Sequence, residues 1–452
     1  MFERISLSPP PIYAQQLFRR TCRLYTWPLD LAFHGIAMRN KDKEILTPLA
    51  ERITDLAARP SQSRKKELWA RHQALLPTDK IPITVNYEGI PEPQWSAMLG
   101  SDYMKCSDGL ARDVEFSLRQ RLWAAEHIGD DQIVWPIVKV PAALSRPLDW
   151  GVPLAWKDSG QELGARSIIA PFADGIDVAR VRFTDAEVDE PATRRRVEAV
   201  TEFTGGNLTV LVSYPSLGFM PFEVAIEMCG IQGLMLYCAD SPREVEALMD
   251  VITSAYISHH ERREREGRLN VWPIGSGRYL VPGIWRVNCS YASPALAESG
   301  PTLSDEWAYV SAQSAAGLSP AMYERFVHVF NCRLAAFFTN ETVYYHGCEK
   351  LDHKLDILAT LPHLRRFHVS PWSSVAAARD KFRGIVILEV HAHPGKVFFT
   401  STPEDMRNEI RALIRAAEGV PLDLNLSDIN SVNSRPQTLT QWAAIAQDES
   451  TP

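Results

Sequence analysis

Histidine and cysteine side chains gather at the ends of three consecutive predicted strands in the C-terminal part of the chain. In parallel α/β folds, ligands bind at the carboxyl ends of the strands, so side chains at neighbouring ends can meet in one site. This grouping is the strongest chemical signal in the sequence. The predicted strands and their polar residues are 342–346 with His346 and Cys348, 365–369 with His368, and 384–390 with His391 and His393.

The spacing of His346 and Cys348 suits a shared metal ion. Residues i and i+2 of an extended strand point the same way, so one zinc ion could bind both, at about 2.0–2.1 Å from nitrogen and 2.3 Å from sulfur. A third ligand from a neighbouring strand would leave one coordination position open for substrate. A purely structural pair is the alternative. The candidates for the third ligand are His391, His393, Glu389 and Cys289.

Other residues near these strand ends could act on a substrate. Glu349 and His368 are the predicted catalytic residues, as a proton donor or as support for a metal ligand, although packing explains His368 equally well. Arg278 and Arg286 could grip a carboxylate, because a guanidinium matches its geometry. The remaining predicted substrate contacts are Trp307, Gln313 and Trp372.

Alternating strands and helices must position these residues. The three C-terminal strands are each followed by a predicted helix, which implies a parallel sheet covered by helices. Barrel and open sheet both fit, but no G-x-G-x-x-G or Walker loop follows any strand, which disfavours a nucleotide-binding open sheet. Upstream we predict strands at 132–140, 208–213 and 234–238, and helices at 44–58, 111–127, from Ser241 onwards and at 304–314, with Asp108 as an N-cap. His259 and His260 lie in a charged helical stretch and are expected at the surface.

Composition and charge narrow the class of protein. The 452 residues are 45% hydrophobic and 23% charged, which supports a large core and argues against disorder. The net charge of −7 gives no general attraction for nucleic acid or anionic lipid, so we expect neither as a partner.

The location of the protein is also predicted from the sequence. There is no run of about 18 apolar residues that could span a membrane, and the first 20 residues lack the features of a signal peptide. The seven cysteines are an odd number at wide spacings, which does not indicate a disulfide framework. We therefore expect a cytoplasmic protein in a reducing compartment.

Two sequence stretches carry a resemblance to a known family. Residues 344–351 (YYHGCEKL) resemble the uroporphyrinogen decarboxylase-like superfamily, and most closely a branch of uncharacterised bacterial members with a Tyr-Tyr-Gly-Cys-Cys-Glu-Pro-like stretch. The similarity continues through 361–372 (LPHLRRFHVSPW), and Gln313 and 317–320 (GLSP) also match. It extends over about residues 110–417 and is specific between 304 and 395.

The resemblance implies a fold and a domain division. It implies a (β/α)8 TIM barrel at 111–420, preceded by a mainly helical N-terminal extension at 1–110 and followed by a tail with a short helix at 421–452.

The resemblance also implies two activities: tetrapyrrole decarboxylation without a cofactor, and zinc-dependent methyl transfer between a methylated substrate or corrinoid and a thiol. The Arg-Gln-Ala-Gly-Arg-Tyr motif of the decarboxylases does not occur in the first 110 residues. His346 and Cys348 match the His-x-Cys zinc pair of the methyltransferases. No cysteine follows Cys348 to match their second one, so His391 or His393 would take its place.

The sequence therefore predicts a zinc-dependent methyltransferase or demethylase acting on a small molecule. The corrinoid would come on a partner protein, because no Asp-x-His-x-x-Gly corrinoid signature occurs here. A homodimer is expected. The alternatives are a lyase or decarboxylase of a small carboxylate, gripped by Arg278 and Arg286, and a non-catalytic barrel that binds a ligand or corrinoid.

Overall fold

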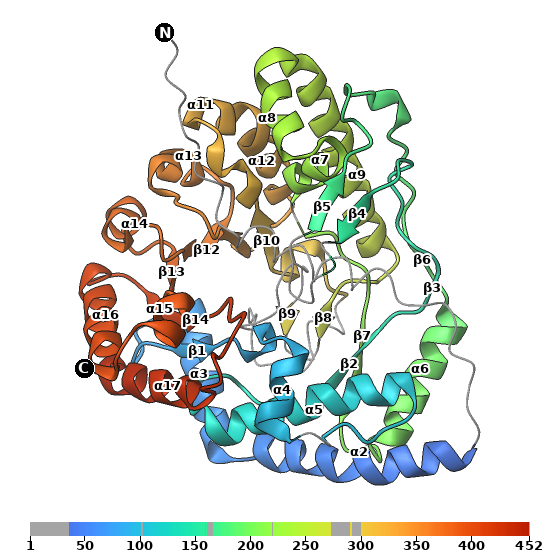
Figure 1. The fold of residues 1–452 in the computed structure, drawn as a ribbon, viewed down its shortest axis with the longest axis vertical. Coiled ribbons are helices and arrows are strands. Elements are labelled where there is room, and N and C mark those ends of the chain that lie inside the picture. The colour runs from blue at the N-terminus through green and yellow to red at the C-terminus, as the bar shows by residue number, and fades with distance from the viewer. Residues whose placement is uncertain are drawn as a thin grey trace.

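The main feature of the fold is a parallel sheet of six strands in the order β1-β14-β13-β12-β11-β10 (Figure 1). The computed structural model describes residues 36–100, 103–158, 160, 166–218, 220–272, 290–291 and 300–451. The strands of the sheet are β1 (Ile83–Val85), β10 (Ala308–Ser311), β11 (Val343–His346), β12 (Leu364–Val369), β13 (Ile387–His391) and β14 (Leu422–Leu426).

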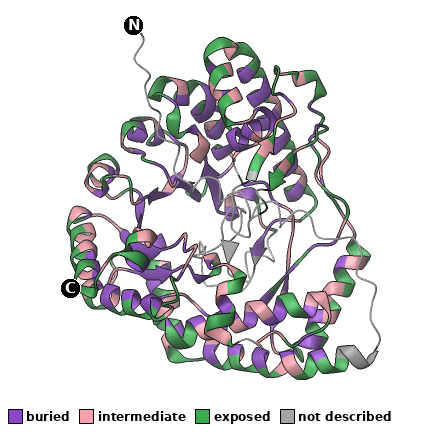
Figure 2. Ribbon diagram, viewed as in Figure 1, coloured by how far each residue is buried: buried purple, intermediate pink, exposed green. Residues whose placement is uncertain are grey.

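Side chains alternate between the two faces of this sheet, and one face is polar. Parallel strands buried on both sides usually read as near-continuous apolar runs, whereas β14 (LDLNL) alternates leucines with polar residues while all five are buried. We call the alternating polar residues of the sheet the polar face. The strands of the sheet are largely buried (Figure 2). The members of the polar face, all buried, are Thr84, Tyr309, Ser311, Tyr344, His346, Arg366, His368, Glu389, His391, Asp423 and Asn425.

Short helices follow the C-terminal strands, and their first residues explain where they begin. Ser374 caps α14 (Val375–Phe382) by accepting a hydrogen bond from the Ala377 backbone N–H. Thr402 and Asp405 form a capping box at α16 (Pro403–Ala416). The other helices of this half are α11 (Pro320–Tyr323), a π-helical turn (Glu324–His328), α12 (Val329–Ala335), α13 (Leu355–Leu358), α15 (Pro394–Phe399) and α17 (Gln437–Ser450).

The N-terminal half forms a second apolar core. Helices α2 (Ile36–Ala57), α5 (Gly109–His127) and α6 (Glu190–Phe203) pack with the parallel pair β2 (Ile137–Pro141) and β7 (Thr209–Ser213). The remaining elements are α3 (Pro60–Gln73), α4 (Glu92–Leu99), β3 (Leu144–Arg146), β4 (Ala155–Asp158), β5 (Arg166–Ile169), β6 (Glu187–Val188), α7 (Pro221–Cys229), α8 (Ile231–Asp240), α9 (Pro242–Arg265), β8 (Val271–Trp272) and β9 (Ser290–Tyr291).

The predicted parallel sheet with helices is confirmed, but a closed barrel is not shown. Among the described residues the six-stranded sheet ends at β1 and β10, and β2–β7 and β8–β9 are separate parallel pairs. The sheet also crosses both expected domain boundaries, because β1 lies before residue 110 and β14 after residue 420. The division into three parts stays a prediction.

Three local predictions were wrong. Residues 234–238 belong to helix α8, because a short apolar run does not distinguish a strand from a buried helix segment. The expected helix at 304–314 is instead a short 3-10 helix (Leu303–Asp305) followed by β10. His259 and His260 are buried rather than exposed.

No single helix of the described residues is both long and apolar enough to cross a bilayer. Helices α7 and α8 reach the necessary length and hydropathy only when taken together, and the chain bends by 100° between them.

Candidate metal centre

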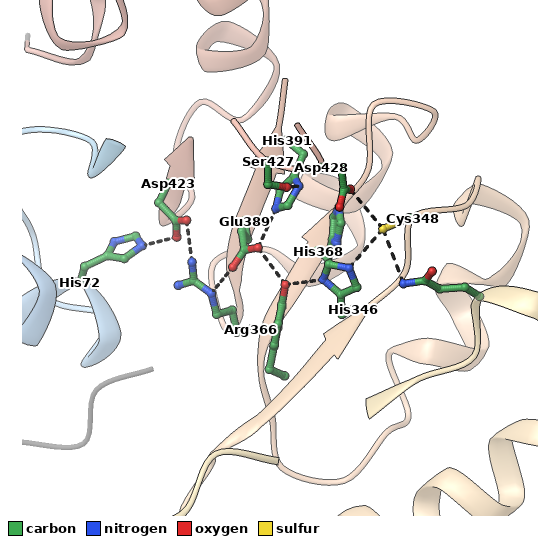
Figure 3. A network of polar contacts seen from close by, with 12 residues as sticks. His72, His346, Cys348, Arg366, His368, Glu389, His391, Asp423, Ser427 and Asp428 are labelled. Carbon is green, nitrogen blue, oxygen red and sulfur yellow. Dashed lines mark hydrogen bonds and ion pairs between the residues drawn. The ribbon is translucent and has the colours of Figure 1, made fainter. Parts of the chain in front are cut away.

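Three histidines of the polar face lie side by side near the carboxyl ends of β11, β12 and β13 (Figure 3). The ring centroids are 4.1 Å apart for His346 and His368, and 3.9 Å apart for His368 and His391. All three rings are buried. The structure therefore brings together residues that the sequence placed at three consecutive strand ends.

Cys348 completes this group from the turn after β11. Its Sγ lies 3.2 Å from His346 Nε2, 3.5 Å from Gln313 Nε2 and 3.6 Å from Asp428 Oδ2. Asp428 follows β14 and adopts a left-handed backbone conformation with φ of 55°, which aspartate tolerates better than most residues. The Cys348 thiol thus contacts an imidazole and a carboxylate that come from the ends of two strands.

Asp428 is a residue that the sequence analysis missed. It lies in the part assigned to a C-terminal tail, although the alternation in residues 422–426 (LDLNL) is the period-2 pattern of a strand. Recognising that strand would have placed Asp428 at a strand end, beside the other candidates.

Two sets of three side chains have potential ligand atoms within 4.8 Å of one another. The first set is His346, Cys348 and His368, and the second is His368, Glu389 and His391. The first combines nitrogen with sulfur, the donors that zinc prefers in proteins. In the second, His391 Nε2 donates to Glu389 Oε1, and the His368 ring stacks on the His391 ring.

Glu389 is the centre of that second set. Its Oε1 accepts from Tyr344 Oη at 2.8 Å and from His391 Nε2 at 2.7 Å, and its Oε2 accepts from Arg366 Nε at 2.7 Å. Burial alone would raise the pKa of Glu389, but the Arg366 guanidinium and the His391 hydrogen bond hold it well below its usual range. Because Ser427 Oγ lies 2.8 Å from His391 Nδ1, both ring nitrogens of His391 are engaged.

His368 has a ring nitrogen that could bind a further ligand. Its Nδ1 lies 2.7 Å from His346 Nδ1, whereas its buried Nε2 has no hydrogen-bond partner in the described part of the chain. Burial, together with the neighbouring His391 and His346 rings, holds the pKa of His368 well below its ordinary value. The ring is therefore uncharged near neutral pH, as a metal ligand requires.

The structure places His393 away from both metal-ligand sets. Its side chain caps α15 by accepting from the Lys396 backbone N–H at 3.3 Å, and its ring meets Trp372 edge-on at 4.7 Å. A histidine two residues after a strand end is here a helix cap.

Glu349 also lies outside both sets. Burial raises the pKa of this carboxyl group to about 7, although the nearby Lys354 ammonium opposes the rise. Its carboxylate oxygens accept no hydrogen bond from the described residues. A side chain at Gly347 would meet Glu349 Oε2 at 2.8 Å, so a larger residue there would have to displace the Glu349 carboxylate.

Only some of the predicted substrate-binding residues lie near the metal centre. Gln313 reaches Cys348, and Trp307 packs with Tyr309, Tyr344 and Met220 beside the polar face. Trp372 is 43% exposed. Three of the candidates from the sequence, Arg278, Arg286 and Cys289, lie outside the residues that the structure describes.

Comparisons with known proteins identify no family for this chain. No protein-family model and no curated protein match it. Solved structures do match, among them a methyltransferase from Methanosarcina mazei, with a TM-score of 0.46 and 13% sequence identity over 85% of this chain and 98% of that one. So distant a likeness assigns neither a family nor an activity, and the resemblance to the uroporphyrinogen decarboxylase-like superfamily stays a prediction.

Proposed function

We propose that this chain is a zinc-dependent enzyme that moves a methyl group between a small methylated substrate and a thiol or corrinoid acceptor. The observation that supports it is the approach of His346 Nε2 to Cys348 Sγ at 3.2 Å, with Asp428 Oδ2 3.6 Å from the sulfur. A nitrogen, a sulfur and an oxygen donor are ligands that zinc takes, and three protein ligands leave its fourth position open, as in catalytic sites.

In this proposal His346 and Cys348 hold the zinc, and Asp428, whose carboxylate lies near the sulfur but outside the two sets above, turns toward the ion as the third ligand. Asp428 replaces the third ligand expected from the sequence, because His391 is engaged at both nitrogens and His393 caps a helix. A thiolate and a carboxylate together would balance the two positive charges of the ion. The zinc would serve to activate a thiol or to polarise the methyl donor.

The surrounding residues would bind and orient the substrate. Gln313 donates to Cys348 Sγ and would fix the thiolate, while Trp307 and Tyr309 would form an apolar wall. When the methyl group passes to the acceptor, the bond to its former heteroatom breaks and that atom keeps the electron pair. The neutral His368 ring would donate a hydrogen bond from Nε2 to the released group, which takes its proton from the acceptor thiol or from water.

We also propose that the strands continue the sheet into a barrel-like ring, the form expected from the sequence. The segment before β2 bonds to β1, because Asp131 N donates to Ile83 O at 2.8 Å. On the far side, Asn270 before β8 bonds to Tyr214 after β7, at 2.9 Å and 3.1 Å. These contacts support a ring that would enclose the polar face.

Metal content tests the proposal. We expect the purified wild-type protein to hold about one zinc per chain by mass spectrometry, and His346→Ala, Cys348→Ser and Asp428→Ala each to lose most of it. His393→Ala is the matched control: it removes a strand-end histidine that the proposal leaves out, and it should retain zinc. A wild-type protein without zinc, purified without chelators, would exclude the zinc mechanism and leave a metal-free lyase or a ligand-binding barrel.

Activity is tested separately, with free methylcobalamin as the donor and a small thiol as the acceptor. We expect the methyl–cobalt bond to be lost only with the zinc-loaded protein, and this loss is measured by absorbance spectroscopy. His368→Gln should bind zinc normally but transfer the methyl group more slowly. If zinc is bound and no methylated donor reacts, the metal site stands and the methyl-transfer assignment fails.

A further inference from the structure

Tyr344 connects the Glu389 carboxylate to the His346 ring. Its hydroxyl oxygen lies 2.8 Å from Glu389 Oε1 and 2.7 Å from His346 Nδ1. A carboxylate can only accept hydrogen bonds, so the hydroxyl proton of Tyr344 belongs to Glu389, and its oxygen must accept from His346. The His346 proton is therefore on Nδ1, where His368 Nδ1, 2.7 Å away, is a second acceptor for it, and Nε2 faces Cys348 Sγ at 3.2 Å.

The same chain of contacts continues away from the metal centre. Arg366 joins two carboxylates, with Nε 2.7 Å from Glu389 Oε2 and a terminal nitrogen 2.5 Å from Asp423 Oδ1. Asp423 Oδ2 lies 2.9 Å from His72 Nε2. Each of these side chains is at most 7% exposed, so water screens the contacts little. His72 belongs to α3, and 351 positions separate it from Asp423 in the sequence.

We propose that Tyr344, Glu389, Arg366, Asp423 and His72 form a support chain that fixes the tautomer and orientation of His346 as a zinc ligand. The inference rests on the proposed function and assigns positioning roles to residues that touch neither zinc nor substrate. Metal-bound histidines commonly donate their second N–H to such a partner, and its loss weakens metal binding. Through His72, the support chain also connects helix α3, which precedes the sheet, to the metal centre.

The first test compares two tyrosines that are adjacent in β11. Tyr344→Phe removes one of the two acceptors of the His346 proton and disconnects His346 from Glu389, and we expect the zinc affinity, measured by competition with a chelator, to fall about 10- to 100-fold. Tyr345→Phe is the matched control. Its hydroxyl is also buried but bonds to Tyr323 Oη at 2.9 Å, on the other face of the strand, so zinc affinity should stay within about twofold of wild type.

The second test acts at the far end of the chain. His72→Leu leaves Asp423 without its imidazole partner, and we expect a smaller loss of zinc affinity, below about 10-fold. His72→Gln keeps an N–H donor at this place and should restore most of the loss. With cobalt(II) in place of zinc, the absorption bands should shift in Tyr344→Phe and in His72→Leu but not in His72→Gln, because they report the geometry of the ligands.

The outcomes separate this inference from the proposed function. If wild type binds no zinc, the proposed function fails first. If wild type binds zinc, and Tyr344→Phe and His72→Leu fold normally with unchanged affinity and cobalt spectra, the support chain is overturned. If Tyr344→Phe does not fold, the two His72 variants decide: equal affinity in both contradicts the inference.

Discussion

Arg366 shows how much a single residue contributes to this molecule, because it lies between two buried carboxylates, Glu389 and Asp423. Removing the guanidinium would leave both with uncompensated charge in a place that water does not reach. We expect Arg366→Met to lower the free energy of unfolding by about 3–5 kcal/mol, measured by urea denaturation. Arg333→Met, which breaks the exposed ion pair with Asp250, is the control and should change stability little. An equal effect of the two variants would contradict this account.

The candidate site was predictable residue by residue only in part. His346, Cys348 and His368 follow from strand-end reasoning, because each lies within or next to a strand with a clear pattern. Asp428 follows only if residues 422–426 are recognised as a strand, and the contact of His72 with Asp423 does not follow at all, since these two partners are 351 positions apart. Only the tertiary fold determines such pairings, and no local spacing rule contains them.

Helix starts can be tested at the scale of single elements. Asp108 was predicted as an N-cap, and it does cap α5 by accepting from the Ala111 backbone N–H at 3.1 Å. Because α5 carries part of the N-terminal apolar core, we expect Asp108→Ala to cost about 1 kcal/mol of stability. Asp108→Ser keeps a capping oxygen and should behave nearly like wild type, as thermal unfolding followed by circular dichroism can establish. A similar loss in both variants would contradict the capping role.

At the start of α9 a capping motif in the sequence does not produce the capping hydrogen bond. Ser241, Pro242 and Glu244 predict a capping box, and Pro242 is indeed the first residue of the helix. The Ser241 side chain, however, makes no capping hydrogen bond with the described residues, because the backbone there has φ of −135° and ψ of 52°. A sequence motif therefore predicts which residues begin a helix. Whether the N-cap side chain makes its capping hydrogen bond depends on the backbone conformation of the residue that precedes the helix.

At the scale of the whole molecule, buried histidines make stability depend on pH. Burial lowers the pKa of His259 despite its contact with Asp185, and lowers that of His260 further. Below the ordinary histidine pKa of about 6.5, the unfolded chain therefore binds protons that the folded chain does not. We expect the free energy of unfolding to fall with decreasing pH from about 6.5, by up to about 1.4 kcal/mol per pH unit for each such histidine.

Urea denaturation at several pH values tests this dependence. His260→Gln removes one titrating group while it keeps a donor for the Leu217 carbonyl, which His260 Nε2 contacts at 2.8 Å. The slope of stability against pH should be shallower in this variant than in wild type. Identical slopes would mean that His260 does not contribute. The exposure of these two histidines was predicted wrongly because the charges around them indicate a surface helix, while α9 also packs one face inward.

The position of β14 has a consequence for how the protein is made. Asp428 and Asp423 come after nearly all of the chain, and β14 lies between β13 and β1, which is separated from it by more than 330 residues. During synthesis on the ribosome, β1 cannot pair with β14 until residue 426 has emerged. Until then the nascent chain carries unpaired strand edges and apolar surface, a state prone to aggregation. Expression at low temperature, or with additional chaperones, should therefore raise the yield of folded protein more than stronger transcription would.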